Sequence, residues 1–242
     1  MKTLYEGILA DIDDVLNSGE KTIKEIIKQW LKDNIGNVSH CKISDKPNKD
    51  GKYEISSKDN IVFKNKIESL TNDLFIWDTV VGNFDCSDCT KLKSLEGAPK
   101  NIGGSLYFSN CKSLQTLEGA PKEVSGNFYC TYCNSLTSLK GAPEKVGKNF
   151  SCSGCKSLHT LEGAPEKVGG EFNCNDCKSL QTLEGAPKEV GCGFYCRWCN
   201  SLKTLKGAPE KVGRNFDCTG CKSLHTLEDA PKNIGGEFIR NK

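Results

Sequence analysis

The sequence of 242 residues lacks long apolar runs, and its charges nearly cancel. No stretch approaches the roughly 20 apolar residues of a transmembrane helix. The first residues do not form the apolar core of a secretory signal, because Glu6, Asp11 and Asp14 interrupt them. A net charge of +2 also excludes the strongly basic surface of a dedicated nucleic-acid or anionic-membrane binder. We therefore expect a cytoplasmic protein with neither a membrane nor a nucleic acid as its partner.

Histidine is scarce, with three residues, whereas cysteine is abundant, with 15. An odd number of cysteines cannot pair completely within one chain. A chain of this length can also form a hydrophobic core without the disulfides that small secreted domains need. We therefore expect reduced thiols that do something other than cross-link the chain.

Most of the cysteines recur with a 22-residue period, as Cys130, Cys152 and Cys174 do. One unit reads F-x-C-x-x-C-x-x-L-x-x-L-x-G-A-P-x-x-V-G-G-x. A fixed period of this size is typical of a solenoid, in which each repeat forms one coil. The first position of the unit is occupied by Phe84, Leu106, Phe128, Phe150, Phe172, Phe194, Phe216 and Phe238.

A longer period of three units overlies the first. The segment CKSLQTLEGAPKEV at 111–124 returns unchanged at 177–190. This identity indicates that a block of three units was duplicated. Features that are three units apart can therefore be inherited together.

The unit favours a short strand and leaves no room for a standard helix. F-x-C alternates apolar and polar positions, as a strand with one buried face does. Gly-Ala-Pro and Gly-Gly interrupt the rest of the unit, because proline removes a hydrogen-bond donor and glycine permits tight bends or close packing. We expect a mainly β fold, a parallel β-solenoid of seven full coils with end coils, about 35 Å long at ~4.8 Å per coil.

The repeat resembles the leucine-rich repeat. The L-x-L-x-x-(N/C)-x-x-L core of that family is matched by Phe128, Cys130, Cys133 and Leu136 and by their equivalents in other units. The array lacks the helical return segment that gives members of this family their strong curvature. A flatter β-solenoid therefore fits the array as well as a curved horseshoe does. The array also resembles uncharacterised repeat proteins of large bacteriophages and gut bacteria, which would imply a viral or bacterial origin.

We divide the chain into a helical hairpin with a linker at 1–50, a degenerate capping coil at 51–80 and the repeat array at 81–242. Apolar residues at helical spacing predict a first helix at about 4–16 and a second at about 20–34. A turn-rich linker at 46–51 leads to an expected strand at 53–56. This hairpin either packs on the end coil or docks another protein.

In the capping coil, one repeat step places Val62 before Phe84 and Lys64 before Cys86. Lys64 is then expected where other coils carry a core cysteine. Trp77 is expected to help close the end of the solenoid, because an open end exposes core residues and strand edges.

Six C-x-x-C pairs allow two interpretations. Zinc requires four convergent ligands, and thiols of neighbouring coils could supply them. Buried cysteine also behaves as a small hydrophobic residue, and the array then holds a ladder of structural thiols. We favour the ladder and expect no metal and no cofactor. Cys41, outside the array, and Cys192, at a glycine position, are candidates for exposed thiols.

Nothing in the sequence indicates catalysis. His159 and His225 are three units apart, so the duplication explains their spacing. No Ser/His/Asp set, phosphate-binding glycine loop or pair of carboxylates stands out. We therefore expect a protein that is not an enzyme.

The variable positions of the array give the candidate site. Between the fixed residues, three positions of each unit are expected to face outward, and each position forms a column along the solenoid. Most residues in these columns are small and polar. Scattered surface aromatics are common and favour strands. However, tyrosine, tryptophan and arginine also dominate interface hot spots. The candidate partner-binding residues are Tyr107, Tyr129, Tyr132, Asn173, Tyr195, Arg197 and Trp198.

These observations predict a non-enzymatic scaffold that binds a protein through its strand face. The phage resemblance narrows this to an inhibitor that masks a host protein, for example a defence nuclease, in the host cytoplasm. One alternative is a structural or virion-associated repeat protein docked by its N-terminal helices, which could also self-associate. The other alternative is a zinc-binding C-x-x-C module.

Overall fold

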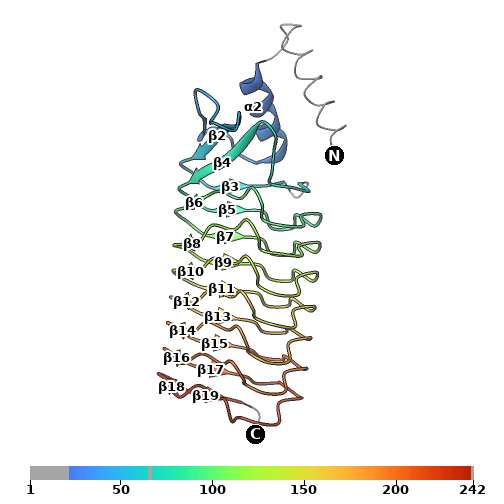
Figure 1. Cartoon of the computed structure of the whole chain (residues 1–242), viewed down its shortest axis with the longest axis vertical. Coiled ribbons are helices and arrows are strands. Elements are labelled where there is room, and N and C mark those ends of the chain that lie inside the picture. The colour runs from blue at the N-terminus through green and yellow to red at the C-terminus, as the bar shows by residue number, and fades with distance from the viewer. Residues whose placement is uncertain (1–21, 65–66, 241–242) are drawn as a thin grey trace.

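A computed structural model describes residues 22–64 and 67–240. It is an elongated column of stacked coils with one helix near the N-terminal end (Figure 1). The mainly β, parallel solenoid with a 22-residue step is confirmed. The coils form a straight stack rather than a strongly curved horseshoe (Figure 1). The first expected helix, at about 4–16, lies outside the described residues.

One parallel sheet of nine strands is built from the first two residues of each unit. Its strands pair in register, so Phe150 lies beside Phe128 on one side and Phe172 on the other. After a first strand in the cap, β3 (Ile61–Val62), the strands are β5 (Phe84–Asp85), β7 (Leu106–Tyr107), β9 (Phe128–Tyr129), β11 (Phe150–Ser151), β13 (Phe172–Asn173), β15 (Phe194–Tyr195), β17 (Phe216–Asp217) and β19 (Phe238–Ile239).

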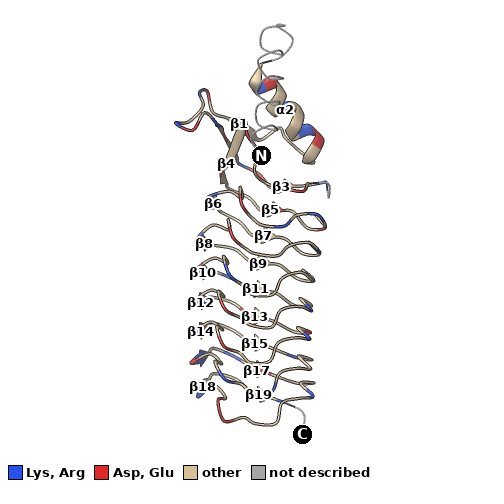
Figure 2. Ribbon diagram, turned by 45° about the vertical axis from the view of Figure 1, so that its right-hand side comes forward, with Lys and Arg blue, Asp and Glu red and all other residues tan. Residues whose placement is uncertain are grey.

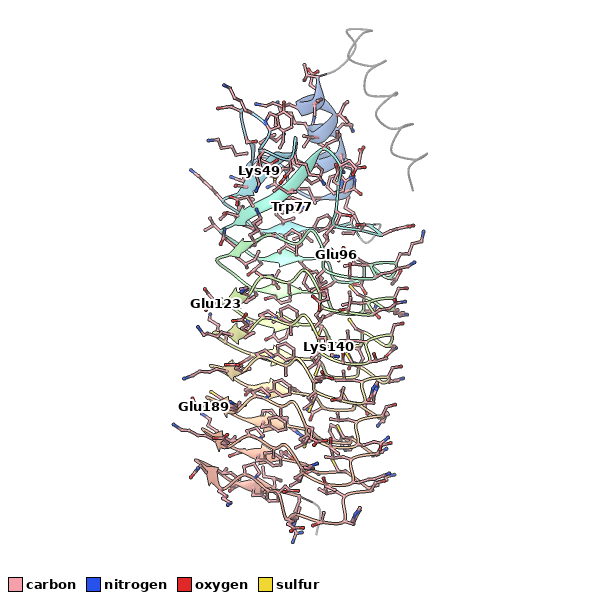
Figure 3. All side chains as sticks on the ribbon, in the orientation of Figure 1. Lys49, Trp77, Glu96, Glu123, Lys140 and Glu189 are labelled. Carbon is pink, nitrogen blue, oxygen red and sulfur yellow. The ribbon has the colours of Figure 1, made fainter. Side chains whose placement is uncertain are left out.

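A second parallel sheet, of six strands, was not expected from the sequence. Each strand follows a Gly-Ala-Pro turn, or Asp-Ala-Pro before the last strand, and has one charged or polar exposed residue and one Val or Ile that faces the interior. Figure 3 shows Glu123 and Glu189 on the outer side of this sheet. The strands are β8 (Glu123–Val124), β10 (Lys145–Val146), β12 (Lys167–Val168), β14 (Glu189–Val190), β16 (Lys211–Val212) and β18 (Asn233–Ile234).

The core is a set of parallel columns of identical side chains. The phenylalanines from Phe128 to Phe238 stack with ring centroids 5.2–5.4 Å apart and ring planes within 3–10° of parallel. The two cysteines and two leucines of each inner coil are completely buried. No single coil could bury these residues, so neighbouring coils depend on each other for a core.

Glycine is required at two points of the coil for different reasons. A Cβ atom on Gly213 would lie 2.0 Å from the carbonyl oxygen of Gly191, so the Gly-Gly position allows close approach of adjacent coils. The glycine of Gly-Ala-Pro adopts the left-handed conformation, with φ of +88° at Gly185. A side chain there would also meet the backbone of Glu162 at 2.5 Å.

The N-terminal end is closed by α2 (Ile23–Asn34) and a four-stranded sheet in the order β1-β2-β4-β6. Thr22 and Glu25 form a capping box at the start of α2, and Ile27 and Leu31 are buried beneath it. The strands of this sheet are β1 (Cys41–Ile43), β2 (Tyr53–Ser57), β4 (Phe75–Val80) and β6 (Asn101–Ile102).

The strand expected at 53–56 is present as β2, and it is parallel to β4 with Tyr53 beside Phe75. The antiparallel edge strand β1 was not expected. It joins residues of the expected N-terminal region to the cap, and the segment at 46–51 forms the turn between β1 and β2.

The register expected for the capping coil is wrong by one residue. Ile61 pairs with Phe84, a step one residue longer than the repeat unit, so Phe63 is buried near the first cysteine position. Lys64 is exposed, and its Nζ donates a hydrogen bond to the carbonyl of Lys32 at 2.6 Å. The extra residue turns the lysine out of the core, where burial of its charge would be costly.

Trp77 is fully buried, as expected for a residue that closes the solenoid. Its ring contacts Phe63 and Phe84 edge-to-face, with centroids 6.1 and 5.5 Å from that of Trp77. This aromatic cluster joins the cap to the first coil of the array.

We predict that Phe172→Ala lowers the free energy of unfolding by about 3–5 kcal/mol, because it leaves a cavity in the middle of the ring stack. Phe238→Ala is the matched control, since Phe238 is only partly buried in the last described coil. Urea denaturation should show a clearly smaller loss for the control. Equal losses would contradict the importance of the buried stack.

Candidate protein-binding surface

Of the three variable columns, only the first lies on a strand, because each strand of the array contains two residues. This first column is the second residue of each strand, from Asp85 to Asp217. The other two columns lie in the turn that follows. The third column, here named the turn column, has φ between 57° and 78° in every coil. It consists of Asp88, Asn110, Tyr132, Gly154, Asp176, Trp198 and Gly220.

Five members of the turn column are Gly, Asn or Asp, the residues that tolerate left-handed φ best. Tyr132 and Trp198 are the exceptions, with φ of 57° each. For a bulky residue this conformation costs about 1–2 kcal/mol. Both side chains are nevertheless exposed, by 57% and 49% respectively, so burial of the ring does not explain their presence.

Each of these two rings lies over a glycine of the next coil. A Cβ atom on Gly154 would lie 2.4 Å from Cδ1 of Tyr132, and one on Gly220 would lie 2.2 Å from Cδ1 of Trp198. Because glycine has no side chain, it leaves the space that the aromatic ring occupies. The two glycines were not identified from the sequence, although their place one unit after an aromatic residue was a usable signal.

The first aromatic cluster contains Tyr107, Tyr129 and Tyr132. Tyr107 and Tyr129 are neighbours on β7 and β9, with ring centroids 5.4 Å apart and planes tilted by 44°. Tyr132 follows Tyr129 in the chain and occupies the turn of the same coil. Two tyrosines in contact and an exposed ring thus occur together in two adjacent coils.

The second cluster contains Tyr195, Arg197 and Trp198 of one coil, with Asp217 of the next. The guanidinium of Arg197 lies 4.9 Å from the centre of the Tyr195 ring and 6.0 Å from that of Trp198. Its Nε is 3.2 Å from Oδ2 of Asp217, although no well-directed hydrogen bond forms there. Burial raises the pKa of Tyr195 above its usual value.

Asp217 was missed as a member of the site. Asp217 is only 6% exposed, and its Oδ1 accepts a hydrogen bond from the backbone amide of Thr219. A carboxylate fixed by its own turn therefore orients Arg197, which stands between two aromatic rings.

Asn173 does not belong to either cluster as a free binding group. Its Oδ1 accepts hydrogen bonds from Oγ of Ser153 and from the amide of Asn175. These contacts tie the turn of its own coil to that of the preceding coil. The side-chain oxygen of Asn173 is thus engaged in local contacts of the fold.

The two clusters are equivalent positions of the duplicated block. Tyr129 and Tyr195 are three units apart, as are Tyr132 and Trp198. Three coil spacings separate them by about 14 Å along the solenoid. The copies differ in sequence at the turn column, Tyr against Trp, and both carry a large aromatic ring there. We call the two clusters together the aromatic turn surface.

Beneath this surface, cysteines at the second cysteine position donate hydrogen bonds to the coil before them, from Cys111 to Cys221. Sγ of Cys155 lies 3.1 Å from the carbonyl oxygen of Cys130, and Sγ of Cys177 lies 3.3 Å from that of Cys152. The same contact recurs along the array between equivalent residues. Within 22–64 and 67–240, no group of three or more His, Cys, Asp or Glu side chains is placed to hold a metal ion.

Three thiols at the first cysteine position of the pair, those of Cys86, Cys130 and Cys152, are held in their neutral form. Burial raises the pKa of Cys86 well above its usual value. Hydrogen bonding with Cys155, followed by burial, does the same for the pKa of Cys130. Contacts with Cys177 and burial likewise raise the pKa of Cys152. These thiols are therefore poor nucleophiles and poor metal ligands at neutral pH.

We predict that stability falls steeply in alkali. Unfolded thiols ionise at about pH 8.5, whereas Cys86, Cys130 and Cys152 stay protonated to higher pH in the folded chain, because their pKa values are raised. The contribution of each thiol to the free energy of unfolding is fully present below pH ~8.5. It decreases as the pH rises above this value, by up to about 1.4 kcal/mol per pH unit for each thiol. Urea denaturation between pH 7 and 10 measures this slope. It should be shallower in Cys152→Ala, and an unchanged slope would contradict the assignment.

We also predict that Cys155→Ala is more destabilising than Cys152→Ala. The first change removes the donor to the buried carbonyl of Cys130, which costs about 1–3 kcal/mol beyond the lost packing. The second change removes an equally large side chain from the same coil and leaves the donors to backbone carbonyls in place. Thermal unfolding of the two variants side by side provides the comparison.

Comparison with known proteins yields no match to a family model, to a curated protein or to a solved structure. The resemblances to the leucine-rich repeat and to phage proteins therefore rest on the sequence pattern alone. Among the described residues, no helix combines the length and apolar character needed to cross a membrane.

Proposed function

We propose that the protein is a non-enzymatic scaffold that binds a partner protein through the aromatic turn surface. The observation that carries the proposal is the left-handed conformation of Tyr132 and Trp198. Equivalent coils use glycine at this place without loss of the fold. A costly conformation that displays an exposed ring is typical of a functional site.

The clusters have the composition and rigidity of interface hot spots. Tyr, Trp and Arg contribute most of the binding energy in many interfaces. The rings are held by Gly154 and Gly220, and Arg197 is held by Asp217. Side chains that are already ordered lose little conformational entropy on binding, which favours affinity.

The spacing of the clusters supports a protein partner of ordinary size. Two rings about 14 Å apart can contact one partner at the same time, since a standard interface extends over about 800 Å² on each side. Turn residues between the clusters, such as Ser153 and Asn175, are small, polar and partly exposed. They suit the part of an interface that excludes water while the rings anchor it.

The narrower proposal is an inhibitor that covers the working surface of a host protein. It is supported by the resemblance to phage repeat proteins and by a rigid binding face. A virion-associated role for the N-terminal region remains the second hypothesis. We do not pursue the zinc module, because the ladder thiols donate to backbone carbonyls.

We predict that replacing Tyr129, Tyr132, Arg197 and Trp198 with Ser abolishes partner binding. The loss of even one strong hot spot weakens binding by at least about 30-fold. Affinity capture identifies the partner, and calorimetry then compares its dissociation constant for the wild type and the variant. Unchanged affinity would rule out this surface.

The matched control changes four exposed residues of the second sheet to Ser: Glu123, Lys145, Lys167 and Glu189. They form two surface ion pairs, which contribute little to stability. This variant should bind normally. Trp198→Gly should weaken binding while changing the free energy of unfolding by less than about 1 kcal/mol, because glycine suits this φ.

A further inference from the structure

A groove of about 430 Å³ lies at the N-terminal end, far in sequence from the aromatic turn surface. It is formed between α2 and the edge strand β1. Its apolar lining consists of Leu31, Val38, Cys41 and Ile43. Leu31 is buried, and the other three are partly exposed.

The groove is surrounded by lysines. Lys24, Lys28 and Lys32 follow one another at intervals of four on α2, so they share a face of the helix, and Lys42 lies on β1. Figure 2 shows basic residues in blue along α2, with acidic residues in red among them. Lys24 is 3.5 Å from Asp45. Within the described part of the chain, Lys28, Lys32 and Lys42 form no ion pair. The groove therefore offers an apolar floor and a positive rim on which three of the four lysines have no ion-pair partner among the described residues.

The segment at 1–21 has the complementary chemistry. It contains five acidic and two basic residues, a net charge of −3. Leu4, Ile8, Ile12 and Val15 recur at helical spacing, and Asp11, Asp13 and Asp14 stand among them. An amphipathic segment of this kind can place apolar side chains in a groove while its carboxylates meet a basic rim.

The connection to the groove is short. Residues 17–21 include Ser18-Gly19, a sequence that favours a turn, and α2 begins at Ile23 beside the groove. Such a tether gives an effective concentration of about millimolar, which favours this segment over a free competitor.

We propose that residues 4–16 occupy the groove between α2 and β1 and that their acidic residues pair with the lysines of its rim. The segment then extends the cap outward and covers β1, whose edge is otherwise open to pairing with another chain. This inference is independent of the aromatic turn surface, so either can fail without the other.

Cys41 provides a built-in reporter, because its thiol lies in the groove. In the full-length chain, D11K/D13K/D14K should increase the rate of Cys41 alkylation on the order of tenfold. Each lost surface pair accounts for a factor of about two, and repulsion adds to it. Mass spectrometry after digestion resolves the sites, and Cys192 serves as the internal control whose rate should not change. An unchanged rate at Cys41 would overturn the proposal.

Reversing the charges on both sides tests whether the acidic residues pair with the lysines of the rim. Adding K28E/K32E/K42E to the triple variant should restore the slow alkylation of Cys41, and failure to do so contradicts pairing at the rim. The wild-type rate should also be the same between about 1 and 100 µM protein, because a tethered segment binds within its own chain. Protection that grows with concentration assigns the groove to a second copy of the chain and overturns the proposal.

Discussion

The in-register stacking of one coil on the next is the constraint on which the rest of the structure depends. Backbone amides of each strand donate to the following coil, as Phe128 does to Asn149 at 2.9 Å. Identical residues are therefore brought together once in every coil, and each must pack well against a copy of itself. Phenylalanine can stack with its copy, cysteine can donate to the preceding coil, and glycine can approach its copy closely. These are the residues that the repeat keeps.

The same constraint separates the core from the variable surface. Inward positions meet their own copies and are nearly uniform, while outward positions meet solvent and vary from coil to coil. At the outward positions, several neighbouring coils carry opposite charges, as in Lys145 with Glu123 and Lys206 with Glu184. Such pairs are weak individually. They do avoid the repulsion that a uniform column of lysines or glutamates would produce.

The period, the parallel sheet and the buried thiols could be predicted from the sequence, because all three follow from a fixed spacing of apolar residues. The second sheet was missed, since its strands have only two residues each and the pattern Lys-Val is too short to indicate a strand. The register of the cap was missed because one inserted residue shifts Val62 and Lys64, and only packing around Phe63 reveals it. Tyr132 and Trp198 were selected correctly as exposed aromatics. Their left-handed backbone depends on where the two-residue strand ends, which no local pattern specifies.

The duplicated block has a consequence for folding. Because 111–124 and 177–190 are identical, coils three apart offer nearly interchangeable partners to any strand that has not yet paired. A folding chain of this kind can omit a block or exchange one with another molecule, as repeat proteins do when they misassemble. The cap contains a pairing that no unit repeats, namely Ile61 with Phe84, whose step is one residue longer than the unit. It is therefore the one fixed origin from which the coils can be counted in the correct order.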